Sequence, residues 1–173
     1  MDNEVPKRKH VRLKNYDYSE IGAYFITICT QNRKNILSRI VTHELGSAEI
    51  QYTLYGKIAE RQLLMLEERY PTVKVDQYVV MPNHIHVILF LKDAAGASPR
   101  PTIMDIICAY KSLTTRECNR IQPNGKLFQT SFYEHVIRGE KDYQEIAEYI
   151  NTNPDKWNID KLFVAEKESS TLC

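Results

Sequence analysis

The chain has 173 residues, of which 43% are hydrophobic and 26% charged, as in an ordinary soluble globular protein of about one domain. Its formal net charge is +1, close to zero, although the basic residues are unevenly placed. No stretch approaches the roughly 18 apolar residues of a membrane span, and the charged start does not resemble a signal peptide.

The first segment, 1–14, is expected to be a basic arm, because five basic residues there face only two acidic ones. Such an arm suits a phosphate backbone, although many such arms only keep a terminus solvated. A single domain is expected over 15–160, followed by a frayed tail over 161–173. The four cysteines show no metal-binding spacing, which favours reduced thiols in a cytoplasmic protein.

The first elements of this domain can be predicted from residue type and spacing. "AYFITICT" (23–30) is rich in β-branched and aromatic residues, which is typical of a strand. The following stretch predicts a loop with a short hairpin that turns near Gly46. Apolar residues then recur at helical spacing from Tyr55 to Tyr70, and Pro71 ends this helix.

A hairpin is expected next. "VKVDQYVVM" (73–81) and "HIHVILFL" (84–91) are both typical of strands. Pro82 and Asn83 lie between them, and this pair suits a tight turn. The two strands should therefore pair antiparallel.

Two helices and one strand complete the prediction. Thr102 and Asp105 can both accept hydrogen bonds from free backbone N–H groups, so a helix should begin there and continue towards residue 120. A strand is expected within 127–138. The last helix is expected within 141–154 and should end at Pro154.

The resulting order is strand, helix, strand, strand, helix, strand, and then one more helix. This order predicts an α+β protein with the ferredoxin-like βαββαβ arrangement. In that arrangement the sheet is antiparallel and the helices cover one face. The additional C-terminal helix lies outside the basic pattern.

His84 and His86 are the most unusual residues of this order, because they stand in an otherwise apolar strand. Side chains alternate faces along a strand, so both imidazoles should point the same way and could hold one ion. The alternative is a pair of partly exposed histidines hydrogen-bonded to their neighbours. Two ligands are too few for a structural zinc site, so an open site shared with substrate oxygens fits better.

The last helix carries a possible nucleophile. Tyr149 and Asn153 are four residues apart, so both can address the same point from one helical face. The alternative is that Tyr149 only packs, since it flanks the apolar stripe that docks the helix.

Together these segments resemble a known family. "VVMPNHIHVIL" resembles the histidine–hydrophobe–histidine (HUH) motif of single-strand DNA endonucleases, and "SFYEHVIRGEKDYQEIAEYINTNPDKW" is similar to the C-terminal signature of the REP-associated tyrosine transposases. "RLKNYDYSEIGAYFITICTQNR" and "IMDIICAYKSLTTRECNR" resemble their N-terminal block and second helix. The resemblance extends over 12–157, and the four blocks stand in the family's order.

The resemblance implies a small transposase-type nuclease with a ferredoxin-like fold. Enzymes of this family cut single-stranded DNA near short hairpins, become joined to it through a 5′-phosphotyrosine, and leave a free 3′-hydroxyl. They use a divalent metal and can rejoin strands by reversing the chemistry. The implied partner is hairpin-forming DNA, and the implied protein is a bacterial cytoplasmic monomer or homodimer that joins the nucleoid when it binds DNA.

The family's functional residues fall on defined positions of this chain. The resemblance implies metal ligation by His84 and His86 and catalysis by Tyr149. A further metal ligand, often Gln in related transposases, falls on Asn153, which is shorter and is biased away from helical geometry by Pro154.

General chemistry is consistent with these roles. A divalent ion can grip a non-bridging phosphate oxygen and offset the charge of the transition state. Oxygen-rich sites favour Mg²⁺ and imidazoles shift the balance towards Mn²⁺, so one of these is the expected cofactor. A phenol, with a pKa of about 10, is both a nucleophile and a fair leaving group for the reverse step.

Other interpretations of these residues compete with the family resemblance. A histidine-triad hydrolase needs a third alternating histidine, where this chain has Ile88. A domesticated module that binds DNA hairpins without cutting them is the main alternative function. Tyr133 and Tyr143 are rival nucleophiles, the first in a rigid strand and the second in an apolar stripe. His135 is expected to bond the backbone or a DNA phosphate rather than a metal.

Basic residues in two places are the expected phosphate contacts. Counterion release would make such binding strongly dependent on salt. The residues are Lys7, Arg8, Lys9 and Arg12 on the arm, with Lys111 and Arg116 on the second long helix.

Overall fold

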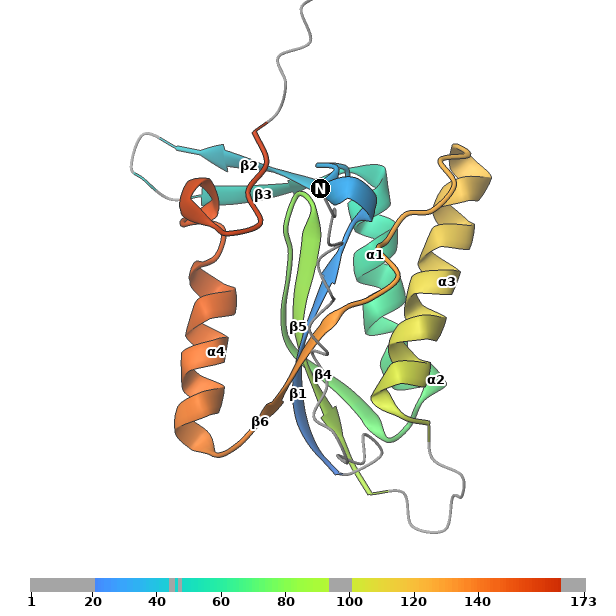
Figure 1. Cartoon of the computed structure of the whole chain (residues 1–173), viewed down its shortest axis with the longest axis vertical. Helices are drawn as coiled ribbons and strands as arrows, with labels where there is room; N and C mark the ends of the chain where they lie inside the picture. The colour runs from blue at the N-terminus through green and yellow to red at the C-terminus, as the bar shows by residue number, and fades with distance from the viewer. Residues whose placement is uncertain (1–20, 44–45, 47, 94–100, 166–173) are drawn as a thin grey trace, which may run out of the picture.

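The structure is a computed structural model that describes residues 21–43, 46, 48–93 and 101–165. Four strands form one antiparallel sheet in the order β4-β5-β1-β6 (Figure 1). They are β1 (Gly22–Cys29), β4 (Val73–Val80), β5 (His84–Leu91) and β6 (Tyr133–Ile137). The basic arm lies outside the described residues, and so do its Lys7, Arg8, Lys9 and Arg12.

Helices cover both faces of this sheet. The helices α1 (Leu54–Leu64), α2 (Leu66–Arg69) and α3 (Ile103–Ile121) lie on one face, and α4 (Glu140–Thr152) lies on the other (Figure 1). The chain is thus a mixed α and β protein with an antiparallel sheet, as predicted. The capping box expected at the start of α3 is present, with Thr102 and Asp105 as its two side chains.

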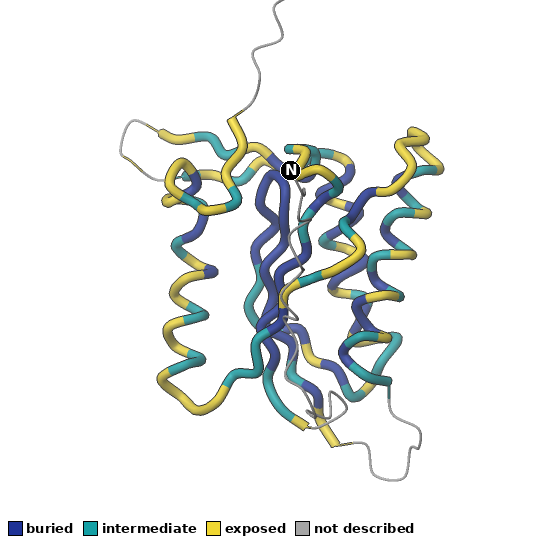
Figure 2. The backbone as a smooth tube through the Cα atoms, in the orientation of Figure 1, coloured by how far each residue is buried: buried dark blue, intermediate teal, exposed yellow. Residues whose placement is uncertain are grey.

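Successive side chains of β1 and β5 point to opposite faces of the sheet, and this separates two apolar cores. Tyr24, Ile26, Val87 and Leu89 face α1 and α3, whose buried residues complete the larger core. Phe25, Val79, Met81 and Ile88 face α4, and this smaller core also holds Ile150 and Trp157. Figure 2 shows the buried strands between the two helical layers. The face towards α4 is the one that carries the two histidines.

The turn between β4 and β5 fixes the point at which β5 begins. The N–H groups of Ile36 and Leu37 both donate to the carbonyl of Pro82, at 3.0 Å each. The N–H of Met81 donates to the carbonyl of His84 at 2.9 Å and closes the turn. The antiparallel hairpin predicted at Pro82 and Asn83 is therefore confirmed, and it sets the register of the histidines.

A second, two-stranded sheet follows η1 (Gln31–Arg33). It consists of β2 (Ser38–Thr42) and β3 (Ala48–Tyr52), which agrees with the hairpin predicted near Gly46. Gly46 has a φ of +80°, a conformation that suits glycine at a turn. The N–H of Ala48 donates to Oδ1 of Asp155 at 3.0 Å, so this hairpin contacts the segment that follows α4.

The end of the described chain is anchored beside the β4–β5 turn. Nδ2 of Asn83 donates to the carbonyl of Leu162 at 2.8 Å, and Nδ2 of Asn35 donates to the carbonyl of Val164 at 2.8 Å. Hydrogen-bonded structure thus extends past the expected boundary at residue 160. The 3₁₀-helix η2 (Trp157–Ile159) connects α4 to this segment.

Two elements differ in extent from the prediction. The expected strand within 127–138 is regular only in β6, since the segment before it makes a single bridge from Phe128 to Thr30. The helix predicted to Tyr70 is divided at Met65, the residue shared by the end of α1 and the start of α2.

Candidate functional site

His84 and His86 lie side by side on the sheet face that α4 covers. Their side chains are buried, with exposed fractions of 0% and 2%, and their ring centroids are 4.5 Å apart. β5 is an inner strand paired with β4 and β1 along its length, so both rings rise from the rigid middle of the sheet. The prediction that they share one face is thus realised in the fold.

The protonation of His84 follows from its hydrogen bond to Asn83. Nδ2 of Asn83 donates to the carbonyl of Leu162, so its Oδ1 is left to accept from Nδ1 of His84 at 2.8 Å. The proton of the neutral ring is then on Nδ1, and Nε2 carries a lone pair. This buried Nε2 has no hydrogen-bond partner among the described residues. A neighbouring side chain therefore leaves Nε2 of His84 able to act as a ligand.

His86 is held from the neighbouring strand. Its Nδ1 lies 2.8 Å from Oγ1 of Thr27, the residue opposite it on β1. A threonine hydroxyl can donate or accept, so it supports either tautomer of the ring. Nε2 of His86 then points towards α4, on the same side as Nε2 of His84.

Burial keeps both imidazoles neutral. It lowers the pKa of His84 from 6.5 to about 4, and the positive charge of Arg33 acts in the same direction, while Asp160 and Asn153 oppose it. Burial also lowers the pKa of His86 well below 6.5, and its neighbour His84 adds to the effect. Neutral imidazole is the form that binds metal ions.

Asp160 completes a three-residue group with the histidines. One ligand atom from each of His84, His86 and Asp160 lies within 4.8 Å of the other two. Oδ1 of Asp160 accepts from the N–H of Leu162 at 2.6 Å, and Oδ2 accepts from Nδ2 of Asn153 at 2.8 Å. Two neutral imidazoles and one carboxylate fit a divalent cation and leave further coordination positions for substrate oxygens.

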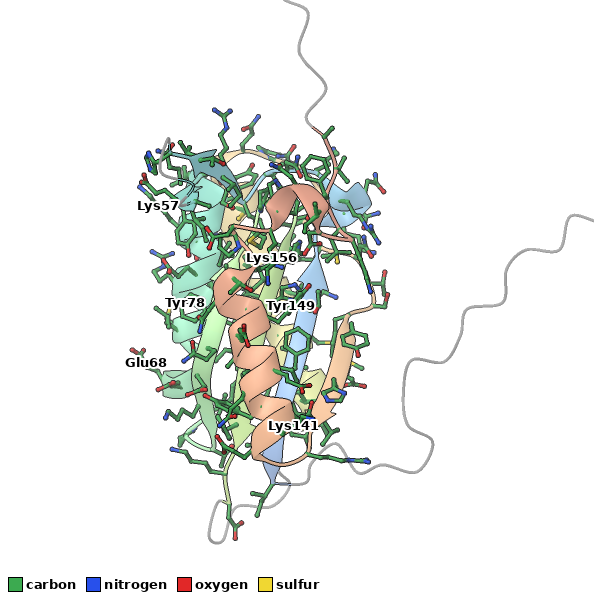
Figure 3. The ribbon with its side chains drawn as sticks, turned by 90° about the vertical axis from the view of Figure 1, so that its left-hand side faces the viewer. Lys57, Glu68, Tyr78, Lys141, Tyr149 and Lys156 are labelled. Carbon is green, nitrogen blue, oxygen red and sulfur yellow. The ribbon has the colours of Figure 1, made fainter. Side chains whose placement is uncertain are left out.

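Tyr149 places its hydroxyl beside this group. The oxygen lies 3.3 Å from Nε2 of His86, and the hydroxyl donates to Oδ2 of Asp160 at 3.4 Å. In Figure 3 Tyr149 projects from α4 on the side of β1, and 42% of the residue is exposed. Burial and the charge of Asp160 raise the pKa of Tyr149 to about 12. The phenol therefore keeps its proton at neutral pH, and a cation in the group would favour its loss.

The two rival tyrosines are placed differently. The hydroxyl of Tyr143 donates to Oδ2 of Asp76 at 2.6 Å, and its ring packs against the smaller core, as its position in the apolar stripe suggested. Tyr133 stands on β6 with 48% of the residue exposed, and its ring contacts Phe25. Of these three tyrosines, Tyr149 is the one whose hydroxyl forms a hydrogen bond with the three-residue group.

Asn153 lies beside the three-residue group, as expected, but with a different backbone conformation from the one expected. It is buried, and it keeps helical backbone angles, φ −59° and ψ −40°, so the expected departure from helical geometry before Pro154 does not occur. Its Nδ2 donates to Asp160, and its buried Oδ1 has no partner within the described part of the chain. Nδ2 thus holds the carboxylate of Asp160, while Oδ1 stays available as the metal ligand that the resemblance implies.

Among the described residues, the hydrogen bonds of the His135 side chain go to the start of α4 and not to the three-residue group. Its Nε2 is 2.9 Å from Oδ2 of Asp142 in the first turn of α4, a partner that is neither the backbone nor a phosphate. The N–H of Arg138 donates to the same oxygen, and this bond and His135 together lower the pKa of Asp142. The pair thus joins β6 to the start of the helix that carries Tyr149.

Lys111 and Arg116 lie on α3, the helix that covers the opposite sheet face. A groove of about 640 Å³ runs between α3 and the segment that follows it, and its lining includes both residues together with Arg120 and Lys126. Nζ of Lys111 donates to the carbonyl of Thr130 at 2.8 Å, and burial lowers its pKa. The structure therefore separates these predicted DNA contacts from the tyrosine.

Sequence reasoning missed three residues of the site. Asn83 stood in the turn beside the histidines, but only the fold shows that it sets the tautomer of His84. Thr27 could have been found from the pairing of β1 with β5. Asp160 follows an irregular segment, and no periodicity or motif pointed to it.

Comparisons with known proteins give the chain its relatives. No protein-family model matches it. It is 31% identical over 176 residues to an uncharacterized protein of Haemophilus influenzae, with 92% of this chain and 95% of that protein covered. In the described part of the chain, no helix has the length and apolarity needed to cross a membrane.

Two named relatives and one solved structure indicate the family. The chain is 26% identical to a putative REP-associated tyrosine transposase of H. influenzae, over 83% of this chain and 77% of the relative. It is 25% identical to the REP-associated tyrosine transposase of Escherichia coli, over 80% of this chain and 70% of that relative. The fold is similar to that of a REP-associated tyrosine transposase bound to a REP hairpin, with a TM-score of 0.61 and 23% identity over 84% of this chain and 73% of that one. Names and fold agree with the resemblance in the sequence, and the chain is a REP-associated tyrosine transposase-like protein.

Proposed function

We propose that this protein is a metal-dependent transposase that recognises DNA hairpins, cleaves one DNA strand through a 5′-phosphotyrosine on Tyr149, and can rejoin strands. The observation that carries the proposal is the hydroxyl of Tyr149 beside His86 and Asp160. The transposase relatives support the reaction class. The proposal includes a ferredoxin-like fold, which the sheet order β4-β5-β1-β6 and the element order support.

The proposed cofactor is Mg²⁺ or Mn²⁺, held by His84, His86 and Asp160. When bound, such an ion supplies positive charge to a non-bridging phosphate oxygen and to the phenol. The protein contributes the orientation of the ligands. Asn83 keeps the lone pair of His84 on Nε2, and Asn153 turns the carboxylate of Asp160 towards the histidines.

The reaction itself exchanges one phosphate ester for another. The phenolic oxygen of Tyr149 forms a bond to phosphorus while the bond from phosphorus to the 3′-oxygen breaks, and the 3′-oxygen leaves as a hydroxyl. Nε2 of His86 and Oδ2 of Asp160, the atoms next to the phenol, would hold the ion, so the phenolic proton passes to water, which also supplies the proton of the leaving 3′-hydroxyl. The phosphotyrosine keeps the energy of the original bond, so a 3′-hydroxyl can attack it and restore a DNA strand without ATP.

The proposed partner is single-stranded DNA that forms a hairpin. The solved relative of similar fold was bound to a REP hairpin, which supports this choice. Lys111 and Arg116, with Lys7, Arg8, Lys9 and Arg12 of the arm, are the proposed phosphate contacts. We further propose that the protein is cytoplasmic, joins the nucleoid when bound to DNA, and acts as a monomer or homodimer.

A denaturing gel separates this enzyme from a module that only binds hairpins. Purified protein is incubated with a labelled hairpin and its single-stranded flanks from DNA beside the gene, with Mg²⁺ or Mn²⁺. We expect a DNA-linked band that resists denaturation and is absent when excess chelator is present. Tyr149→Phe should give no band, while Tyr143→Phe, the matched control on the same helix, should give one. Hairpin binding without any covalent band would contradict the proposal.

A further inference from the structure

Exposed aromatic rings gather at one place in the described chain. Among its exposed large hydrophobic residues, the aromatic ones are Tyr133, Tyr149 and Phe163, with exposed fractions of 48%, 42% and 38%. They come from β6, from α4 and from the segment after η2. Scattered exposed apolar residues need no explanation, but three large rings from separate elements around one polar group do.

Ring contacts connect two of these residues through the histidines. Starting from Tyr133, the centroid distances are 6.3 Å to Phe25, 5.2 Å from Phe25 to His86, and 4.5 Å from His86 to His84. They continue at 5.9 Å from His84 to Trp157 and 5.2 Å from Trp157 to Phe163. We call these six residues the aromatic row. Its middle is buried at the candidate metal group, and its two ends are exposed.

Both ends of the aromatic row are held in place by ordered backbone. Tyr133 lies in β6 opposite Thr27, the residue that also bonds His86. The N–H of Phe163 donates to the carbonyl of Asp160 at 3.0 Å. Phe25 and Trp157, which support the two end rings, are only 8% and 7% exposed. The two exposed rings thus stand at the two ends of the aromatic row, and the group that the proposed function assigns to the phosphate lies in its middle.

We propose that Tyr133 and Phe163 are stacking platforms for two unpaired nucleobases, one on each side of the scissile phosphate. An exposed aromatic ring is stabilised most by stacking on another flat ring. Every nucleobase presents such a ring, whatever the DNA sequence. A nucleotide carries its base beside its phosphate, so a strand whose phosphate sits at His84 and His86 has its neighbouring bases to either side. This inference rests on the proposed function and adds the reason why the strand is unpaired.

The platforms would select against duplex DNA at this site. A base inside a duplex already stacks on its neighbours, so its faces are not available to a protein ring. A single strand exposes those faces and loses little by turning them towards Tyr133 and Phe163. Sequence preference at these two positions should be weak, because stacking is tolerant of the base.

Binding measurements test the inference without requiring cleavage. All proteins are full-length and carry Tyr149→Phe, which prevents covalent capture. A short mixed-sequence single-stranded oligodeoxynucleotide and a blunt duplex of the same sequence are each titrated by fluorescence anisotropy. The variants are Tyr133→Leu and Phe163→Leu, with Tyr133→Phe as the conservative variant. Leu64→Ala is the matched control, since Leu64 is 47% exposed on α1, away from the aromatic row.

We expect Tyr133→Leu and Phe163→Leu each to weaken single-strand binding by about tenfold, as loss of one stacked base should. Tyr133→Phe and Leu64→Ala should bind as the parent does, and duplex binding should change little in every variant. Unchanged single-strand binding in both leucine variants, or an equal loss for single strand and duplex, would overturn the inference. A leucine variant that dissociates a dimer in size-exclusion chromatography would show instead an interface between copies of the chain, which also overturns it. A covalent band from the unsubstituted protein in any of these cases leaves the proposed function standing.

Discussion

The hydroxyl of Tyr149 lies 3.3 Å from Nε2 of His86, although 63 positions separate these residues in the chain. The histidine is held by the middle of the sheet, whereas the tyrosine depends on how α4 docks. Two hydrogen bonds fix that helix at its first turn, from Tyr143 to Asp76 and between Asp142 and His135. The histidines stand on a rigid strand, whereas the tyrosine stands on a helix that is anchored separately. This arrangement allows the nucleophile to approach the phosphate and withdraw with the DNA.

The first prediction concerns the ligands of the metal. Asp160→Ala should weaken Mn²⁺ binding by at least about tenfold, because it removes a charged ligand from beside two neutral ones. Glu148→Ala is the matched control, since Glu148 is an exposed acid on α4 and should leave affinity unchanged. Electron paramagnetic resonance of free Mn²⁺ during a titration of the purified protein measures the effect.

Asn153→Ala separates the two possible third ligands. If Asn153 only orients Asp160, its removal should cost less affinity than removal of Asp160. A larger loss with Asn153→Ala, together with an unaffected Asp160→Ala, would identify Asn153, the ligand implied by the family resemblance, as the third ligand in place of Asp160.

Much of this site follows from short-range patterns in the sequence. The alternation of residues along β5 places His84 and His86 on one face, and Pro82 with Asn83 marks the turn that starts the strand. Helical spacing likewise places Tyr149 and Asn153 on one face of α4. These features depend on neighbouring residues alone, which is why sequence reasoning reaches them.

Asp160 could not be reached in that way. Its position depends on α4 ending at Thr152, on one irregular turn through η2, and on hydrogen bonds from the following segment to Asn83 and Asn35. None of these contacts leaves a periodic signal. The helical angles of Asn153 before Pro154 show the same limit, because local bias gave way to tertiary contacts.

The second prediction is a pH dependence of stability in metal-free protein. The folded-state pKa of His84, about 4, lies below its ordinary value of 6.5, so between these pH values the unfolded chain binds more protons. Above pH 6.5, His84 should therefore cause no change in the free energy of unfolding. As the pH drops from 6.5 towards 4, that free energy should fall by up to about 3 kcal/mol. Urea denaturation in chelating buffer across this range measures it.

His84→Gln is the control for this dependence, because it removes the titrating ring and keeps a polar side chain. Its unfolding free energy should vary less with pH over the same range than that of the parent. Parallel curves for the two proteins would show that His84 does not account for the loss.

The third prediction concerns the groove on α3. Arg116→Ala should lower affinity for hairpin DNA and make binding less dependent on salt, by about one unit in the slope of log affinity against log salt concentration. Lys57→Ala on the exposed side of α1 is the matched control for loss of one charge. Equal slopes for the parent and Arg116→Ala would remove Arg116 from the set of phosphate contacts.

The fourth prediction tests how α1 is seated against the β2 side of the fold. A Cβ atom on Gly56 would overlap the carbonyl oxygen of Leu37, a contact that the backbone cannot accept without moving. Gly56→Ala should therefore reduce the free energy of unfolding by about 1–3 kcal/mol or more. Gly22→Ala, whose Cβ would meet its nearest atom at 3.9 Å, should cost much less. Thermal and urea denaturation of both variants would measure the difference, and equal losses would contradict the prediction.

The central claim is that Tyr149 is the residue that becomes joined to DNA. Protein that has reacted with a labelled hairpin in Mn²⁺ is digested with protease and nuclease, and mass spectrometry then locates the remaining nucleotide. We predict that the nucleotide is on the peptide that contains Tyr149, attached through its 5′-phosphate. A nucleotide on Tyr133 or Tyr143, or a covalent adduct formed by Tyr149→Phe, would contradict the account.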